Sequence, residues 1–96
     1  MDYYFAANIR IHNPDHYQKY LEKADSVFEK YKGVYLAVDE TPQVLEGEWN
    51  YSKSVLIRFP SKEDFEKWYY SDEYQEILKF RLDASESDSI LIRGSD

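Results

Sequence analysis

The 96-residue sequence contains no cysteine, only three glycines, and few basic residues relative to acidic ones. The absence of cysteine excludes disulfide bonds, thiol nucleophiles and thiolate metal sites. Twelve Lys and Arg against nineteen Asp and Glu give a formal net charge of −7, and no Lys/Arg cluster is present. Because phosphate groups are recognised by basic surfaces, we expect neither nucleic acids nor membranes as partners.

Long hydrophobic runs are also missing. The longest uninterrupted apolar runs have five residues, 3–7 and 34–38, whereas a membrane-spanning helix needs about 20. The first residues lack the basic segment and apolar run of a secretory signal. The three glycines are scattered and form no phosphate-binding loop, and the two histidines lack metal-site spacing. We therefore expect a cytoplasmic protein without a bound metal or cofactor.

The hydrophobic pattern predicts one α+β domain over residues 1–96. Residues 3–12 alternate as in a strand with one apolar face. Asn13-Pro14 is typical of a helix start, and an apolar stripe at helical spacing continues to Tyr31. Gly33 is predicted to be the left-handed residue that ends this helix. The later segments are expected to be strands at 34–38, 54–59 and 87–93, further extended structure at 43–49, and helices that begin after Ser61 and Ser71.

The predicted element order is β-α-β-β-α-α-β. With right-handed crossovers this order gives a ferredoxin-like fold, in which helices cover one face of a four-stranded antiparallel sheet. The second face of such a sheet is left bare, and a chain this small usually covers it with a partner. We therefore expect a homodimer in which two sheets pack face to face, as in a dimeric α+β barrel.

Short motifs in a fixed order also carry a family resemblance. They are Ala7-Asn8-Ile9, Asn13-Pro14 with Tyr17 and Tyr20, Glu46-Gly47-Glu48-Trp49, Phe59-Pro60-Ser61, Ser71-Asp72-Glu73-Tyr74 and Arg81. With these motifs the chain resembles domain-of-unknown-function family 1330, in the dimeric α+β barrel superfamily. The resemblance implies a small cytoplasmic dimer with no assigned reaction. Superfamily relatives include cofactor-free monooxygenases, muconolactone isomerase-like enzymes and haem proteins, so no catalytic residue is carried over.

Arg81 is the first candidate ligand-binding residue, because it lies on the apolar stripe of the last helix, seven residues after Tyr74. A buried guanidinium keeps its charge and needs hydrogen-bond acceptors. One interpretation is a fork that binds a carboxylate or phosphate of a ligand. The other is internal pairing with Glu46, Asp83 or helix-end carbonyls, with the stem of the side chain over the core.

Arg10 and Arg58 form a second candidate group on the face of the sheet away from the helices. Their two strands are expected to be central, adjacent and parallel, so that both arginines lie near the C-terminal ends, with Glu46 and Glu48 on the next strand. Gly47 is expected to form a bulge that reorients Glu46. The arrangement predicts either an anion-binding cavity between the sheets or a network of paired charges across the dimer.

Three aromatic residues, Trp68, Tyr69 and Tyr74, surround the expected junction of the last two helices. Aromatic side chains at such a junction can form the wall of a pocket. Their helical spacing is also typical of an ordinary core. The sequence therefore leaves both roles open for them.

Three functional hypotheses follow. The first is a homodimer that binds a small anionic or aromatic molecule at the sheet–helix or sheet–sheet interface. The second is a cofactor-free isomerase or monooxygenase-like enzyme that acts on a small carboxylate-bearing or aromatic substrate, in which Arg10, Arg58 or Arg81 holds an anion. Glu46 or His12 would then carry the proton. The third is a structural or regulatory dimer without a ligand.

Overall fold

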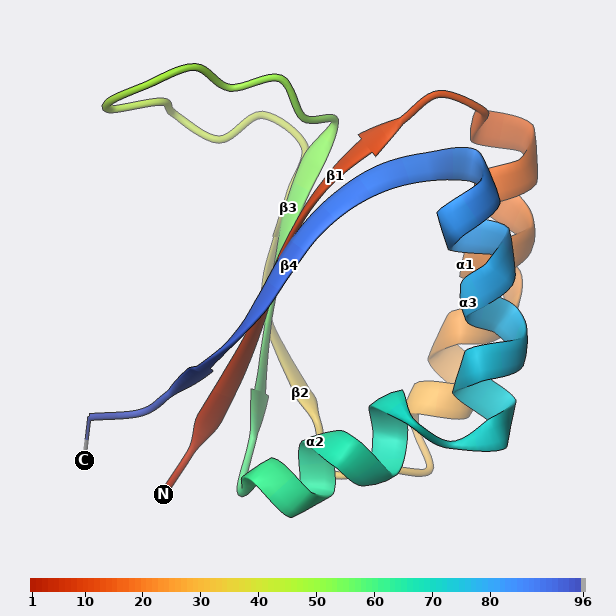
Figure 1. Cartoon of the computed structure of the whole chain (residues 1–96), viewed down its shortest axis with the longest axis vertical. Helices are drawn as coiled ribbons and strands as arrows, with labels where there is room; N and C mark the ends of the chain where they lie inside the picture. The colour runs from red at the N-terminus through yellow and green to blue at the C-terminus, as the bar shows by residue number, and fades with distance from the viewer. Residues whose placement is uncertain (96) are drawn as a thin grey trace.

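One sheet and one layer of helices make up the fold, shown in Figure 1 as a computed structural model that describes residues 1–95. The observed order confirms the predicted β-α-β-β-α-α-β arrangement and the ferredoxin-like α+β class. The elements are β1 (Tyr3–Ile11), α1 (Pro14–Phe28), β2 (Val34–Asp39), β3 (Lys53–Phe59), α2 (Lys62–Tyr69), α3 (Asp72–Ala84) and β4 (Ser85–Arg93).

The strands lie in the order β2-β3-β1-β4, and every neighbouring pair is antiparallel. The expectation that the two central strands, β1 and β3, run parallel is therefore wrong. Helix α1 returns the chain so that β2 runs in the same direction as β1, and the direct connection from β2 then reverses β3. The C-terminal ends of β1 and β3 consequently lie at opposite ends of the sheet.

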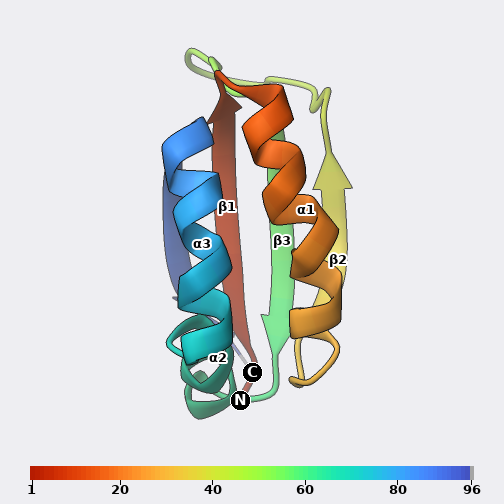
Figure 2. The same ribbon diagram turned by 90° about the vertical axis from the view of Figure 1, so that its right-hand side faces the viewer.

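The helices cover only one face of the sheet (Figure 1). Seen from the helix side in Figure 2, α1 and α3 lie side by side over the strands, and α2 covers the end where the two termini lie. We call the covered face the inner face and the opposite one the outer face. Phe5, Ala7 and Ile57 are buried on the inner face, whereas Ile90 and Ile92 are exposed on the outer face. This confirms the predicted alternation.

The starts of the helices follow from local side-chain chemistry. Asn13, Ser61 and Ser71 each accept a hydrogen bond from the backbone N–H three residues later. Such bonds satisfy amide groups that have no partner within the helix. All three predicted helix starts are thus confirmed.

Gly33 differs from the expectation, since its backbone is not left-handed; the positive φ, 87°, belongs to Gly47. A Cβ atom at Gly33 would instead come within 2.5 Å of the Phe28 ring and 2.8 Å of the Phe59 ring. The glycine is therefore needed because two core rings approach the backbone closely, not because of its conformational freedom.

Residues 40–52 form a long loop rather than the extended strand expected at 43–49. Figure 1 shows this loop projecting beyond the sheet, at the upper left. The pairing of β2 with β3 already ends at Asp39 and Ser54, so the loop has no strand beside it to pair with. Gly47 lies in the loop and forms no bulge; the irregularity of the sheet is in β2, between Tyr35 and Ala37.

Candidate functional site

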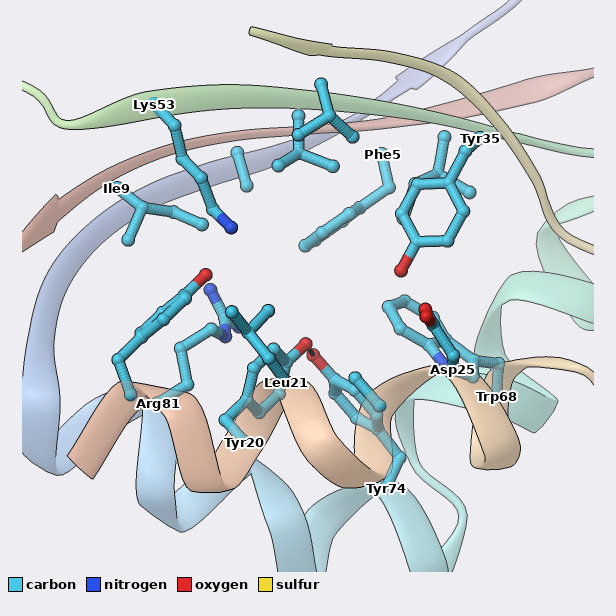
Figure 3. Close-up of a pocket in the computed structure, with 16 residues that line it drawn as sticks. Phe5, Ile9, Tyr20, Leu21, Asp25, Tyr35, Lys53, Trp68, Tyr74 and Arg81 are labelled. Carbon is cyan, nitrogen blue, oxygen red and sulfur yellow. Dashed lines mark hydrogen bonds between the residues drawn. The ribbon is translucent and has the colours of Figure 1, made fainter. Parts of the chain in front are cut away.

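A cavity of about 410 Å³ lies between the inner face of the sheet and the helices. Side chains from β1, β2, β3 and all three helices line it (Figure 3). Four of these residues are exposed: Leu21 and Asp25 on α1, and Tyr35 and Val38 on β2. The cavity therefore opens to solvent between α1 and the edge strand β2.

Arg81, in the last turn of α3, lines this cavity and is only 3% exposed. Its Nη1 donates to the Ser87 hydroxyl at 3.2 Å, and its Cζ lies 5.7 Å from the centre of the Tyr20 ring. Within residues 1–95 its Nε has no hydrogen-bond acceptor, and no carboxylate lies within 4.0 Å of the guanidinium. Neither Glu46 nor Asp83 pairs with it. Arg81 is thus a buried charge that has neutral hydroxyls, and no carboxylate, as partners among residues 1–95.

Lys53, the first residue of β3, is a second cation at the cavity. Its Nζ lies 4.7 Å from the centre of the Tyr17 ring. Burial lowers the pKa of the Lys53 amine; the positive charge of Arg81 acts in the same direction, and the Glu40 carboxylate opposes both. In the described part of the chain no carboxylate lies within 4.0 Å of this amine.

Lys53 is not among the candidate residues predicted from sequence, because the strand predicted at 54–59 begins one residue after it. The alternation of β3 carried the relevant signal, since Lys53, Val55 and Ile57 are two residues apart and share the inner face. Extending the strand by one residue at its start would have placed the lysine opposite the helices.

Four tyrosines add hydroxyl groups to the cavity lining. Tyr20 and Tyr74 share a hydrogen bond of 2.7 Å between their hydroxyls. Burial raises the pKa of Tyr17 and of Tyr35 to about 12, and it also raises the pKa of Tyr20 and Tyr74 above the ordinary value. All four are therefore neutral near pH 7 and can donate hydrogen bonds to a ligand.

The charges are separated within the cavity. Figure 3 shows the head groups of Arg81 and Lys53 close together at one end, and Asp25 and Tyr35 at the other. Trp68 also lines the cavity, and its Nε1 has no acceptor among residues 1–95. Aromatic walls with two cations at one end are suited to a small, flat ligand with a negative group.

Three of the residues singled out from sequence, Arg81, Trp68 and Tyr74, are brought together in this cavity. Tyr69 lies outside it and stacks on Phe65, with ring centres 5.3 Å apart. His12 follows β1 and is not part of the cavity lining.

Arg10, Arg58 and Glu46 do not come together. Arg58 is opposite Tyr4 in the sheet, six residues along β1 from Arg10, which corresponds to about 20 Å. Arg10 instead forms an ion pair of 2.7 Å with Glu86 of β4, and Glu46 lies in the loop at 40–52. The predicted neighbouring position of the two arginines is wrong because it depended on parallel central strands.

Residues 1–95 contain neither a metal-binding cluster nor a membrane-spanning helix. No group of three or more His, Cys, Asp or Glu residues is placed to hold a metal ion. No helix in this range combines the length and the apolar character needed to cross a membrane.

Comparison with solved structures shows the same fold in proteins of low sequence identity. A Rhodopseudomonas palustris protein of unknown function, RPA0582, is 19% identical with a TM-score of 0.76, covering 99% of this chain and 83% of the other. A dimeric ferredoxin-like protein of unknown function from Thermobifida fusca is 13% identical with a TM-score of 0.69, covering 98% and 92%.

The cofactor-independent oxygenase SnoaB from Streptomyces nogalater is 11% identical with a TM-score of 0.70, covering 99% of this chain and 94% of the other. At such identities the likeness extends to the fold alone. No curated protein matches the sequence. The family described as "Domain of unknown function (DUF1330)" matches residues 2–95. The chain therefore belongs to the DUF1330 family.

Proposed function

We propose that this protein binds a small, flat organic anion in the cavity between the sheet and the helices. The observation that carries the proposal is Arg81, a guanidinium that faces the cavity without a carboxylate partner. A buried charge without a counter-charge is costly, and a ligand carboxylate would supply that charge. The planar guanidinium suits a carboxylate because it can donate two parallel hydrogen bonds.

The rest of the cavity supports an aromatic or similarly flat ligand. Phe5, Trp68 and Tyr74 contribute ring surfaces, and Lys53 adds a second positive charge beside Arg81. A volume of about 410 Å³ lies in the range of small-molecule pockets. A benzoate-sized acid would place its carboxylate at the cationic end and its ring between the aromatic walls.

Isothermal titration calorimetry with benzoate and with its neutral analogue benzamide tests the proposal. We expect benzoate to bind and benzamide to bind at least about tenfold more weakly, because hydrogen bonds to charged groups contribute more than neutral ones. Arg81→Lys retains the charge but loses the fork, and should weaken benzoate binding by a similar factor. Arg10→Lys, on the outer face, is the matched control and should bind as the wild type.

Two results would contradict the anion pocket. One is equal affinity for benzoate and benzamide. The other is a folded Arg81→Lys variant, verified by circular dichroism, that binds benzoate as tightly as the wild type.

A cofactor-independent enzyme is the second candidate, favoured by the lowered pKa of Lys53 beside a buried cation. An amine of this kind can accept a proton from a carbon acid while Arg81 holds its carboxylate. In D₂O we expect the protein to accelerate deuterium incorporation into phenylpyruvate, followed by NMR, and Lys53→Met to remove the acceleration. Exchange no faster than in buffer would reject this activity.

We further propose that two copies of the chain assemble through the outer faces of their sheets. Ile90 and Ile92 of β4 lie on this face and are 60% and 45% exposed, and Figure 1 shows no helix over it. Sedimentation velocity should give a dimer for the wild type and a monomer for Ile90→Arg, since an unpaired charge in an interface is costly. Leu82→Arg is the control, because Leu82 is similarly exposed, at 56%, but lies on α3. A dimeric Ile90→Arg variant would rule out this interface.

A further inference from the structure

Lys53 differs from the other seven lysines of the chain in lining the cavity. Its Nζ lies over the Tyr17 ring rather than beside a carboxylate. By contrast, Lys30 is paired with Glu73 at the surface. In the part of the chain that the structure describes, the Lys53 amine is thus available to a molecule inside the cavity.

The surroundings of Lys53 increase the fraction of its amine that is neutral. Burial lowers its pKa, and the Arg81 charge adds to this effect. Glu40 opposes the shift, but its carboxylate lies beyond ion-pair distance. A neutral lysine amine is a nucleophile toward carbonyl carbons, and desolvation or a nearby cation is a recognised way to activate it.

Arg81 and Lys53 present different chemistry to the same end of the cavity (Figure 3). The guanidinium has an unpartnered Nε and can hold a carboxylate, whereas the amine can react. We propose that Lys53 forms an imine with a small aldehyde or ketone whose carboxylate is bound by Arg81. The inference rests on the proposed anion-binding function of the cavity and names the ligand class more narrowly, as oxo acids.

The covalent step needs no oxidant, reductant or metal. The Lys53 nitrogen attacks the carbonyl carbon and forms a carbinolamine. The carbonyl oxygen then leaves as water, taking both hydrogens of the amine, and a C=N bond replaces the C=O bond. Hydrolysis reverses the reaction, so added sodium cyanoborohydride is needed to reduce the imine to a stable secondary amine.

Reductive trapping with 4-carboxybenzaldehyde tests the inference. We expect intact-protein mass spectrometry to show one dominant adduct and peptide mapping to place it on Lys53, with the seven other lysines as references within the same molecule. Excess benzoate should slow the labelling because it occupies Arg81. Benzaldehyde, which lacks the carboxylate, should label Lys53 at least about tenfold more slowly, because the anchoring interaction is absent.

Two variants complete the design. Lys53→Arg keeps the positive charge without a nucleophilic amine and should lose the adduct, and circular dichroism verifies that the variant is folded. Arg81→Gln keeps the amine and should label as slowly as benzaldehyde labels the wild type. If Arg81→Gln does not fold, the competition with benzoate on the wild type tests the same contribution.

The outcomes separate this inference from the proposed function. Benzoate binding together with labelling spread evenly over the lysines would overturn the imine and leave the anion pocket standing. The same conclusion follows if Lys53→Arg is labelled as extensively as the wild type. Absence of both benzoate binding and selective labelling would overturn the two proposals together.

Discussion

Two arginines on opposite sides of the sheet, Arg10 in β1 and Arg81 in α3, show how differently the same side chain is used. Arg10, on the outer face, forms an ion pair with Glu86, donates to the Asn50 carbonyl at 2.6 Å, and lies 5.1 Å from the centre of the Tyr51 ring. Arg81, under the inner face, is far more buried but has neutral hydroxyls, and no carboxylate, as partners among residues 1–95. Within one chain, Arg10 thus has more partners than Arg81, although water can solvate Arg10 and it needs those partners less.

The contrast places an uncompensated positive region inside an acidic protein. The chain carries a net charge of −7, yet the cavity holds two cations without an ion-pair partner among residues 1–95. Local charge and the low polarity of the surrounding walls govern ligand binding more than net charge does. The net negative charge argues against polyanionic partners such as nucleic acids, but it is compatible with a pocket for a small anion.

Removing the buried charge should give the largest change in stability. Without ligand, Arg81→Met is expected to increase the free energy of unfolding by about 1–4 kcal/mol, the gain that replacing a buried ion pair by apolar residues of similar size can give. The same variant should not bind benzoate. Urea denaturation measures the first effect and calorimetry the second. A marked loss of stability would show that Arg81 is mainly structural and would remove the contrast with Arg10.

The next largest effect is expected at alkaline pH, at which tyrosines on the inner and outer faces should contribute differently to stability. Because the pKa values of Tyr17 and Tyr35 rise from 10 to about 12 on folding, the unfolded chain loses protons first, and stability is lost as the pH rises from about 10 to about 12. Tyr17→Phe should reduce this loss. In the Ile90→Arg background, in which the outer face stays in contact with water, Tyr51→Phe should hardly change it, because solvent screens the Tyr51–Asp88 hydrogen bond. Thermal melts at a series of pH values provide the measurement.

The titration of Lys53 should change stability in the opposite direction. Its pKa is lowered on folding, so stability should rise as the pH increases through that lowered value toward the ordinary 10.5, where the unfolded chain also loses its proton. Lys53→Met should abolish this rise and leave the loss at higher pH in place. A pH profile that Lys53→Met does not alter would show that the amine is solvated as fully as a surface lysine.

The smallest effect is expected for the ion pair on the outer face. In the Ile90→Arg background, in which the outer face stays in contact with water, Arg10→Gln should destabilise the chain by only about 0.2–1 kcal/mol, because its partner Glu86 is well exposed and the pair is screened by solvent. Benzoate affinity should be unchanged. Urea denaturation at low and high salt should show the difference shrinking as salt is added. A larger effect that salt does not reduce would mean that Arg10 is structurally as important as the buried core.

Local patterns predicted the fold well because they depend on short-range chemistry. The side chains of Asn13, Ser61 and Ser71 cap the helices as expected, and strand alternation identified the inner face. The direction of β3 relative to β1 and the need for glycine at position 33 depend on contacts distant in sequence. Such contacts leave no local signature in a single sequence.

The candidate site was predicted only in part for the same reason. Arg81 was identifiable, since a charge on an apolar helical stripe conflicts with the local pattern. Tyr17 and Tyr20 follow that pattern, so their sequence positions indicate core and give no sign of a cavity. Whether a stripe of large side chains fills the space beneath the sheet or leaves it open depends on how far apart the two layers lie.

The hydrogen bond between Tyr20 and Tyr74 can reverse its direction, so that either hydroxyl can be the one that donates. Whichever one donates to its neighbour, the neighbour keeps its own proton free for a third group. Rotating the two hydroxyl protons about their C–O bonds exchanges donor and acceptor without moving a heavy atom. Ligands that differ in where they offer a lone pair can thus meet the same rigid wall, so that recognition tolerates variation at this point while the cationic end remains selective.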